Sequence, residues 1–132
     1  MHHSKVLIIE DDADVRLGYR VLLKAHGYET CFAGDGMSAI SSARHEKPDL
    51  IILDLGLPAG DGYLVLERFR SNTHLMDIPV IVVSARDQVA HKDRALAAGA
   101  KAYLQKPWID EVLLGLLARF LGHVAPLRTS SS

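Results

Sequence analysis

Five residues with metal-binding or reactive side chains stand at the ends of short apolar runs in this chain, or directly after them. They are Glu10, Asp11, Asp54, Ser84 and Lys106. Carboxylates are hard oxygen ligands suited to Mg²⁺, and a carboxylate can also attack phosphorus to form an acyl phosphate. The three acids and the lysine together carry a formal charge of −2, which one divalent cation would cancel.

The apolar runs predict the elements that position these residues. Residues 6–9, 50–53, 80–83 and 102–104 are short and unbroken, and most of them are rich in β-branched side chains. This pattern is typical of strands buried on both faces of a parallel sheet. In an open α/β sheet, ligands bind beyond the carboxyl ends of the strands. We therefore expect the polar residues to converge on one edge of a sheet.

Helices are predicted between these strands, with one more strand at about 29–33. Asp12 is a good N-cap for a first helix that ends at Gly27. Further helices are expected at about 36–47, 63–70 and 86–98, the last closed by Gly99, and around the apolar stripe from Val112 to Phe120. The alternation predicts an α/β fold with right-handed crossovers and helices on both faces. The fourth helix is rich in alanine, so we expect it to be held loosely.

Composition and net charge limit the classes of protein to which this chain could belong. The chain has 132 residues, of which 48% are hydrophobic, enough for the core of one domain. Its net charge is −1 and neither sign clusters, so no nucleic-acid or membrane surface is indicated. Cys31 is the single cysteine and cannot form an internal disulfide, which favours a reducing compartment. No segment is typical of a membrane span or a signal peptide, so a cytoplasmic protein is predicted.

Several short motifs occur in an order and spacing that resemble a known family. They are Ile9-Glu10-Asp11-Asp12, Leu53-Asp54-Leu55-Gly56-Leu57-Pro58 with Asp61-Gly62, Val83-Ser84-Ala85-Arg86, Gly99-Ala100 and Tyr103-Leu104-Gln105-Lys106-Pro107-Trp108. Together they resemble the receiver domain of two-component response regulators of the chemotaxis-receiver type, over about Lys5 to Leu121.

The resemblance implies a flavodoxin-like three-layer sandwich, with a five-stranded parallel sheet in the order 2-1-3-4-5 and five helices. Residues 5–122 would form the receiver domain. Residues 1–4 would be an N-terminal extension or a tag remnant, and residues 123–132 a flexible tail or the start of a linker. The Lys106–Pro107 bond is cis in the resembled family.

The resemblance also implies a function. Asp54 would accept a phosphoryl group from a histidine kinase or a histidine phosphotransfer protein, in a reaction that needs Mg²⁺. Asp11 and Asp54 would ligate the metal directly, Glu10 would act through water, and the backbone carbonyl of Gly56 would complete the protein's share. Such a protein is a signalling switch rather than an enzyme, because it catalyses only its own phosphorylation and dephosphorylation.

The remaining residues of the site have implied roles in stabilisation and switching. Lys106 would place a positive charge against a phosphoryl oxygen. The hydroxyl of Ser84 would be drawn toward the attached group, and Tyr103 would follow into the space that Ser84 leaves. The added charge would bias the fourth helix and fifth strand, and so regulate a partner or an output domain.

The chain departs from the family pattern at four places. Glu10 stands where aspartate is commoner. Gly56 and Arg86 occupy positions that modulate how easily water reaches an acyl phosphate in this family. The segment 100–102 lacks the acidic pair found in receivers that dimerise through the last two strand–helix units, so a monomer or a weak dimer is expected.

Two other classes of function remain open at this stage. One is an interaction module that keeps the fold without being phosphorylated; the acid cluster and Lys106 argue against it. The other is a Mg²⁺-dependent phosphatase that uses Asp54 as its nucleophile. Gly56, two residues later, leaves no nearby general acid of the kind that such an enzyme needs.

Overall fold

The computed structural model describes residues 3–57 and 62–122. Pro58 and Asp61, two positions of the motif around Asp54, lie outside the described residues. So do residues 1–2 of the expected N-terminal extension and the whole of the expected tail, 123–132.

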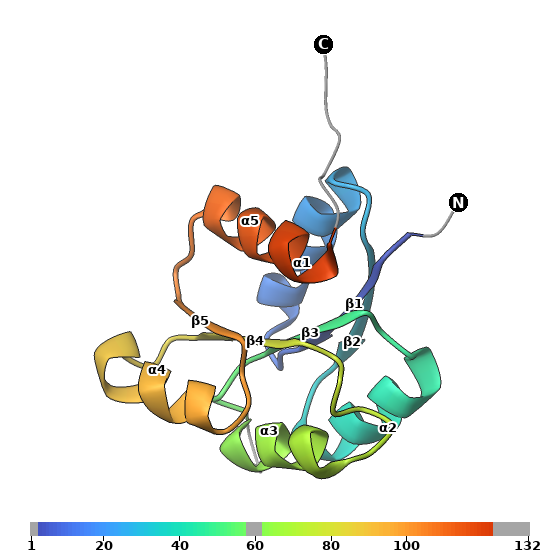
Figure 1. Cartoon of the computed structure of the whole chain (residues 1–132). Coiled ribbons are helices and arrows are strands. Elements are labelled where there is room, and N and C mark those ends of the chain that lie inside the picture. The colour runs from blue at the N-terminus through green and yellow to red at the C-terminus, as the bar shows by residue number, and fades with distance from the viewer. Residues whose placement is uncertain (1–2, 58–61, 123–132) are drawn as a thin grey trace.

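Five parallel strands form one sheet (Figure 1). They are β1 (Lys5–Ile9), β2 (Glu29–Ala33), β3 (Leu50–Leu53), β4 (Val80–Ser84) and β5 (Ala102–Gln105). Their order in the sheet is β2-β1-β3-β4-β5, which confirms the predicted topology. The three central strands are almost entirely buried, as their unbroken apolar runs require in a sheet covered on both faces.

Five helices cover the two faces of the sheet. They are α1 (Ala13–Ala25), α2 (Gly36–Glu46), α3 (Gly62–Ser71), α4 (Gln88–Ala97) and α5 (Asp110–Leu121). Helices α1 and α5 lie on one face, and α2, α3 and α4 lie on the other (Figure 1). Each face has its own apolar core, because alternate side chains of every strand point to opposite sides. The three-layer architecture is therefore as predicted.

Side-chain caps fix where the helices begin. Asp12 caps α1, as expected, by accepting hydrogen bonds from the backbone N–H groups of Asp14 and Val15. The predicted start of α4 at Arg86 is two residues early. Asp87 is the N-cap and accepts from the N–H of Val89, so α4 begins at Gln88. The helix closes at Ala98, and Gly99 follows with a φ of +115° that favours glycine.

Helix α4 has little buried surface of its own. Ala95 is its only fully buried residue in the described chain, and Val89 is almost completely exposed. The helix packs on β5, and side-chain contacts with α3 add to its support. Arg70 donates a hydrogen bond to the carbonyl of Ala97, and the guanidinium of Arg94 lies 3.7 Å from the centre of the Tyr63 ring. These features agree with the expectation of a loosely held helix.

Candidate functional site

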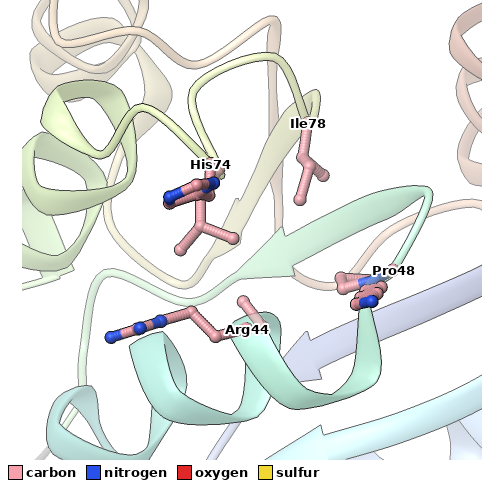
Figure 2. Close-up of a pocket in the computed structure, with 7 residues that line it drawn as sticks. Arg44, Pro48, His74 and Ile78 are labelled. Atoms are coloured by element: carbon pink, nitrogen blue, oxygen red, sulfur yellow. The ribbon is translucent and has the colours of Figure 1, made fainter.

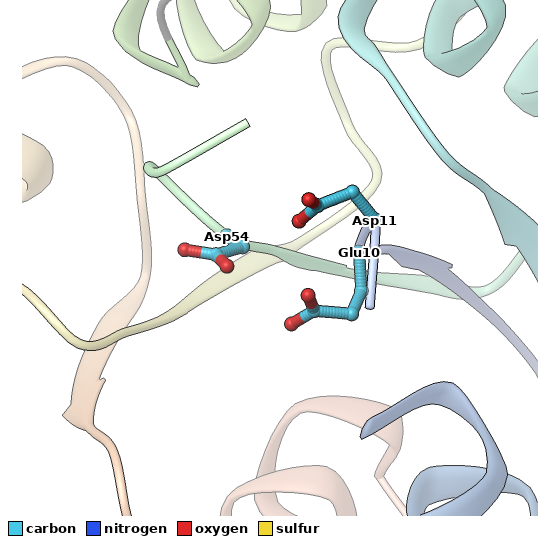
Figure 3. A group of neighbouring side chains, drawn as sticks. All are labelled: Glu10, Asp11 and Asp54. Atoms are coloured by element: carbon cyan, nitrogen blue, oxygen red, sulfur yellow. The ribbon is translucent and has the colours of Figure 1, made fainter. Parts of the chain in front are cut away.

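Three carboxylates converge at the carboxyl ends of β1 and β3. Glu10 and Asp11 follow β1, and Asp54 follows β3, the neighbouring strand. All three face a common space (Figure 3), and one oxygen from each lies within 4.8 Å of the others. Glu10 is 2% exposed and Asp54 is 8% exposed, whereas Asp11 is open to solvent. The convergence predicted from the four apolar runs is present.

Lys106 joins this cluster from the end of β5. Its Nζ donates to Glu10 Oε1 at 2.6 Å and to Asp54 Oδ2 at 3.0 Å. The second oxygen of Glu10 accepts a hydrogen bond from the backbone N–H of Asp12. The peptide bond between Lys106 and Pro107 is cis. One lysine therefore bridges two of the three carboxylates, at the point where the chain leaves the sheet.

Burial and charged neighbours shift the pKa values of Glu10 and Lys106. Burial raises the pKa of Glu10 above its usual value, although the hydrogen bond from Lys106 opposes the shift. The pKa of Lys106 is also raised. Burial alone would lower it, but the hydrogen bonds to Glu10 and Asp54 more than offset burial. The lysine is thus held in its charged form, which is the form that can meet an anionic oxygen.

The carboxylate of Asp11 differs from its two neighbours. Within residues 3–57 and 62–122, no protein group donates a hydrogen bond to its side chain. Oxygen atoms on three carboxylates, one of them without a protein donor, form a donor set that fits a hard divalent cation such as Mg²⁺. The exposed Gly56 lies beside this set, and its N–H donates to Asp54 Oδ1 at 2.9 Å.

Gly62 shapes the site through its lack of a side chain. A Cβ at this position would collide with the Cα of Leu55 and would lie 3.0 Å from the carbonyl oxygen of Asp54. The start of α3 can therefore rest directly against the backbone that carries Asp54. Gly62 belongs to one of the sequence motifs, but its steric role is not evident from the sequence. The available signal was a glycine at the start of a helix, eight residues after the central aspartate.

Ser84 and Tyr103 lie on the β4 side of the site. Ser84 is buried, and its Oγ accepts a hydrogen bond from the N–H of Arg86, whose own side chain is exposed. Tyr103 is buried too, and its hydroxyl donates to the carbonyl oxygen of Arg86 at 2.7 Å. Burial raises the pKa of this phenol. Both side chains thus form hydrogen bonds with the backbone of Arg86, two residues after Ser84.

A cavity elsewhere on the molecule lacks this chemistry. About 470 Å³ in volume, it is lined by Arg44, Pro48, His74 and Ile78, among others, from the end of α2 and the connection that precedes β4 (Figure 2). No carboxylate lines it. The acidic cluster with its lysine is therefore the candidate site.

The fold and this site define a class of protein. The model of the response regulator receiver domain family matches residues 6–118, so the chain belongs to that family. It is a receiver domain of the kind found in two-component response regulators, which act as signalling switches.

Named relatives and solved structures agree with the family. The transcriptional regulatory protein PrrA of Mycobacterium tuberculosis is 37% identical over 128 residues, which cover 97% of this chain and 54% of PrrA. The chain thus spans about half the length of the curated relatives that it matches.

A response regulator structure from Chloroflexus aurantiacus matches 92% of this chain and 100% of its own, with a TM-score of 0.87 and 29% identity. The receiver domain of the sensor histidine kinase PA1611 from Pseudomonas aeruginosa matches with a TM-score of 0.83 and 28% identity, over 92% of this chain and 99% of its own. That structure has a magnesium ion in its active-site cleft.

The helices are short or amphipathic. In the part of the chain that the structure describes, none of them is both long and apolar enough to cross a bilayer.

Proposed function

We propose that Asp54 accepts a phosphoryl group from the phosphohistidine of a histidine kinase or a histidine phosphotransfer protein. The observation that carries the proposal is the environment of Asp54. It is a nearly buried carboxylate, hydrogen-bonded to Lys106 and within 4.8 Å of two further carboxylates. An aspartate with a purely structural role would need only its ion pair with Lys106. It would not need two further carboxylates close to it.

The transfer step is a displacement at phosphorus. An oxygen of Asp54 forms a bond to phosphorus while the P–N bond of the phosphohistidine breaks. The electron pair of that bond stays on the imidazole nitrogen of the donor. Negative charge spreads over the three remaining phosphoryl oxygens, so positioned cations stabilise the transition state. Lys106 is the cation that this chain supplies, and its raised pKa keeps it charged.

Asp11, Asp54 and the backbone carbonyl of Gly56 would hold Mg²⁺, with Glu10 acting through water. When bound, Mg²⁺ would neutralise the charge that develops on the phosphoryl oxygens. One observation supports direct ligation by Asp11. Its carboxylate accepts no hydrogen bond from the described residues, so both of its oxygens are available to a cation.

The conformational response would begin at Ser84. Its Oγ accepts a hydrogen bond from the N–H of Arg86, and the carbonyl of Arg86 accepts one from the hydroxyl of Tyr103. A phosphoryl group adds about −1.5 to −2 charge and strong acceptor oxygens, which would attract the Ser84 hydroxyl. The connection between β4 and α4 would then rearrange, and α4 would follow because it buries so little surface.

The switch would regulate a partner or an output domain, and the name of PrrA points to transcription as the process. The cytoplasm is the compartment that we assign to the chain. The free thiol of Cys31 supports a reducing environment. The only reactions that we assign to the chain are phosphorylation and dephosphorylation of its own Asp54.

The test is the intact mass of the chain after incubation with phosphoramidate, a small donor that also carries a P–N bond. The parent is expected to gain one phosphoryl group when Mg²⁺ is present and none when it is chelated. Asp54→Asn should gain none. The matched control is Asp12→Asn, since Asp12 is an adjacent carboxylate outside the cluster and asparagine is also a good N-cap.

The proposal fails if Asp54→Asn gains the group at the parent's rate, or if the metal-replete parent gains none. In the second case an interaction module that works without phosphorylation becomes the better account.

A further inference from the structure

Arg16 reaches from the second turn of α1 back over the acidic end of β1. Its Nη1 donates to the carbonyl oxygen of Glu10 at 2.8 Å and to that of Asp11 at 3.3 Å. Three carboxylates lie close by, yet Arg16 forms no ion pair with any acid in the described chain. Its Nη1 is hydrogen-bonded to the backbone of the first two residues of the site, Glu10 and Asp11.

This backbone has few other supports. The N–H of Glu10 donates to the carbonyl of Ala33, and the N–H of Asp12 donates to the Glu10 side chain. The side chain of Asp11 accepts no hydrogen bond from the described residues. Where its carboxylate points therefore depends on how its own backbone is held, and Arg16 is the only described side chain that binds the Asp11 carbonyl.

Gly34 provides the room that this arrangement needs. A Cβ added to Gly34 would lie 3.6 Å from Arg16 Nη1, at ordinary contact distance. The guanidinium thus lies against the loop between β2 and α2. A branched side chain at Gly34 would extend beyond that Cβ, and we expect it to crowd the guanidinium.

We infer that Arg16 is a positioning residue for the cation site, acting through the backbone of Glu10 and Asp11 to aim the Asp11 carboxylate at Asp54. This inference rests on the proposed function, because it assumes that Asp11 and Asp54 bind Mg²⁺. Residues that orient metal ligands typically contribute about 10-fold to 100-fold in metal affinity. Arg16 does not touch the cation or the phosphoryl group in this account.

The sign of the effect separates positioning from simple charge. A positive side chain near a cation site repels the cation, so removing the charge alone would strengthen Mg²⁺ binding. Loss of positioning weakens binding instead. Arg16→Lys keeps the charge but puts its nitrogen on a shorter, more flexible stem, which is less able to hold the two carbonyls that Nη1 serves. Arg16→Gln removes both the charge and the guanidinium.

Mg²⁺ affinity can be read from Trp108, the single tryptophan. It follows Lys106 and Pro107, and its ring stacks on Tyr19 with centroids 4.6 Å apart. We expect Arg16→Gln and Arg16→Lys each to weaken Mg²⁺ binding by about 10-fold, and Gly34→Val to weaken it by less. Arg20→Gln is the matched control. It removes a charge from the same helix, where Arg20 lies over Phe32 and makes no contact with the acidic loop.

The outcomes are distinguishable. Parent-like or tighter Mg²⁺ binding by both Arg16 variants overturns the positioning role. Parent-like binding by Arg16→Lys alone keeps that role and shows that an ammonium can fill it, because loss of charge alone would strengthen binding in Arg16→Gln. A parent chain that binds no Mg²⁺ overturns the proposed function and this inference together. The melting temperature of each metal-free variant is measured alongside. If Arg16 had only a structural role, its substitution would lower that temperature and leave the Mg²⁺ affinity of the folded protein unchanged.

If Arg16→Gln does not fold, Gly34→Val carries the test, since it is expected to crowd the guanidinium without removing it. Parent-like Mg²⁺ binding by Gly34→Val then overturns the inference.

Discussion

A lysine meets carboxylates at both ends of the sheet, and the two clusters differ in what they leave unmatched. At the amino ends of the strands, Lys5 pairs with Glu46 at 3.1 Å, and the N–H of Lys5 donates to Asp49 at 2.8 Å. At the carboxyl ends, Lys106 pairs with Glu10 and Asp54. We call the first group the Lys5 cluster and the second, with Asp11, the Lys106 cluster.

Burial separates the two clusters. The side chains of Lys5 and Glu46 are 32% and 35% exposed, whereas those of Lys106 and Glu10 are 19% and 3% exposed. The Lys5 cluster holds two carboxylates and one lysine within reach of water, and it ties α2 to the start of β1. In the Lys106 cluster a third carboxylate, that of Asp11, lies beside two buried carboxylates and accepts no hydrogen bond from the described residues. Water screens the surplus charge of the Lys5 cluster, whereas surplus charge beside buried carboxylates at the ends of the strands prepares a site for a ligand.

The largest expected difference follows removal of each lysine in metal-free protein near neutral pH. Lys106→Met leaves Glu10 buried without its cation and should cost about 3 kcal/mol of unfolding free energy. Lys5→Met removes a pair that water screens and should cost much less. Urea unfolding of both variants and the parent gives the two values. Equal small losses would contradict the distinction between the clusters.

The Lys106 variant also sharpens the functional side of the comparison. We expect Lys106→Met to keep Mg²⁺ binding, because Asp11 and Asp54 remain. It should switch poorly, because the cation that meets the phosphoryl group is gone. The environment of Tyr103, followed by nuclear magnetic resonance before and after treatment with phosphoramidate, is the readout. A parent-like change at Tyr103 would count against the role of Lys106.

A second comparison uses glycines at the two ends of the sheet. Gly62→Ala places a Cβ against the backbone of Leu55 and should destabilise the chain by about 2 kcal/mol while reducing phosphoryl uptake. Gly27, which follows α1 at the other end, has open space around it but a φ of +84°. Gly27→Ala should therefore cost about 1 kcal/mol and leave uptake unchanged. Denaturant unfolding and intact mass measure both effects. Parent-like uptake by Gly62→Ala would show that the turn after Asp54 tolerates a side chain.

The last prediction concerns Cys31, near the Lys5 cluster, and it has no consequence near neutral pH. Burial, with a contribution from Glu46, raises the pKa of this thiol to about 11. The folded state therefore favours the neutral thiol. Its contribution to stability is complete below the unfolded-state pKa of about 9 and is lost as the pH rises from there toward 11. Alkylation by iodoacetamide should reach half its maximal rate near pH 11 in the folded chain and near pH 9 in urea. A midpoint near 9 in both states would contradict this environment for Cys31.

Much of this architecture is predictable from the sequence for a definite physical reason. Strands buried on both faces must be apolar throughout, so β1, β3 and β4 are visible as runs such as Val80–Val83. The residue that follows such a run in a parallel sheet must lie at the carboxyl edge, which is why Asp54 and Glu10 could be placed together. The strand order came from the family resemblance rather than from the runs.

Other features depend on contacts that no local pattern encodes. The start of α4 was misplaced because Arg86 fits a helix, while the hydrogen bond of its N–H to Ser84 keeps it outside. The steric role of Gly62 requires knowing that α3 approaches Leu55. The orientation of Tyr103 is a choice of rotamer, and its bond to the carbonyl of Arg86 joins elements 17 residues apart. Each of these involves a particular approach of two segments, which composition and periodicity do not specify.

The central claim is that the Lys106 cluster makes Asp54 the phosphoryl acceptor. Borohydride reduces an aspartyl phosphate to an alcohol, which marks the position permanently for mass spectrometry of peptides. After treatment of the Mg²⁺-replete chain with phosphoramidate and then borohydride, we expect the mark on the peptide that contains residue 54 and on no other. A mark on Asp11 or Asp49, or none at all, would contradict the account.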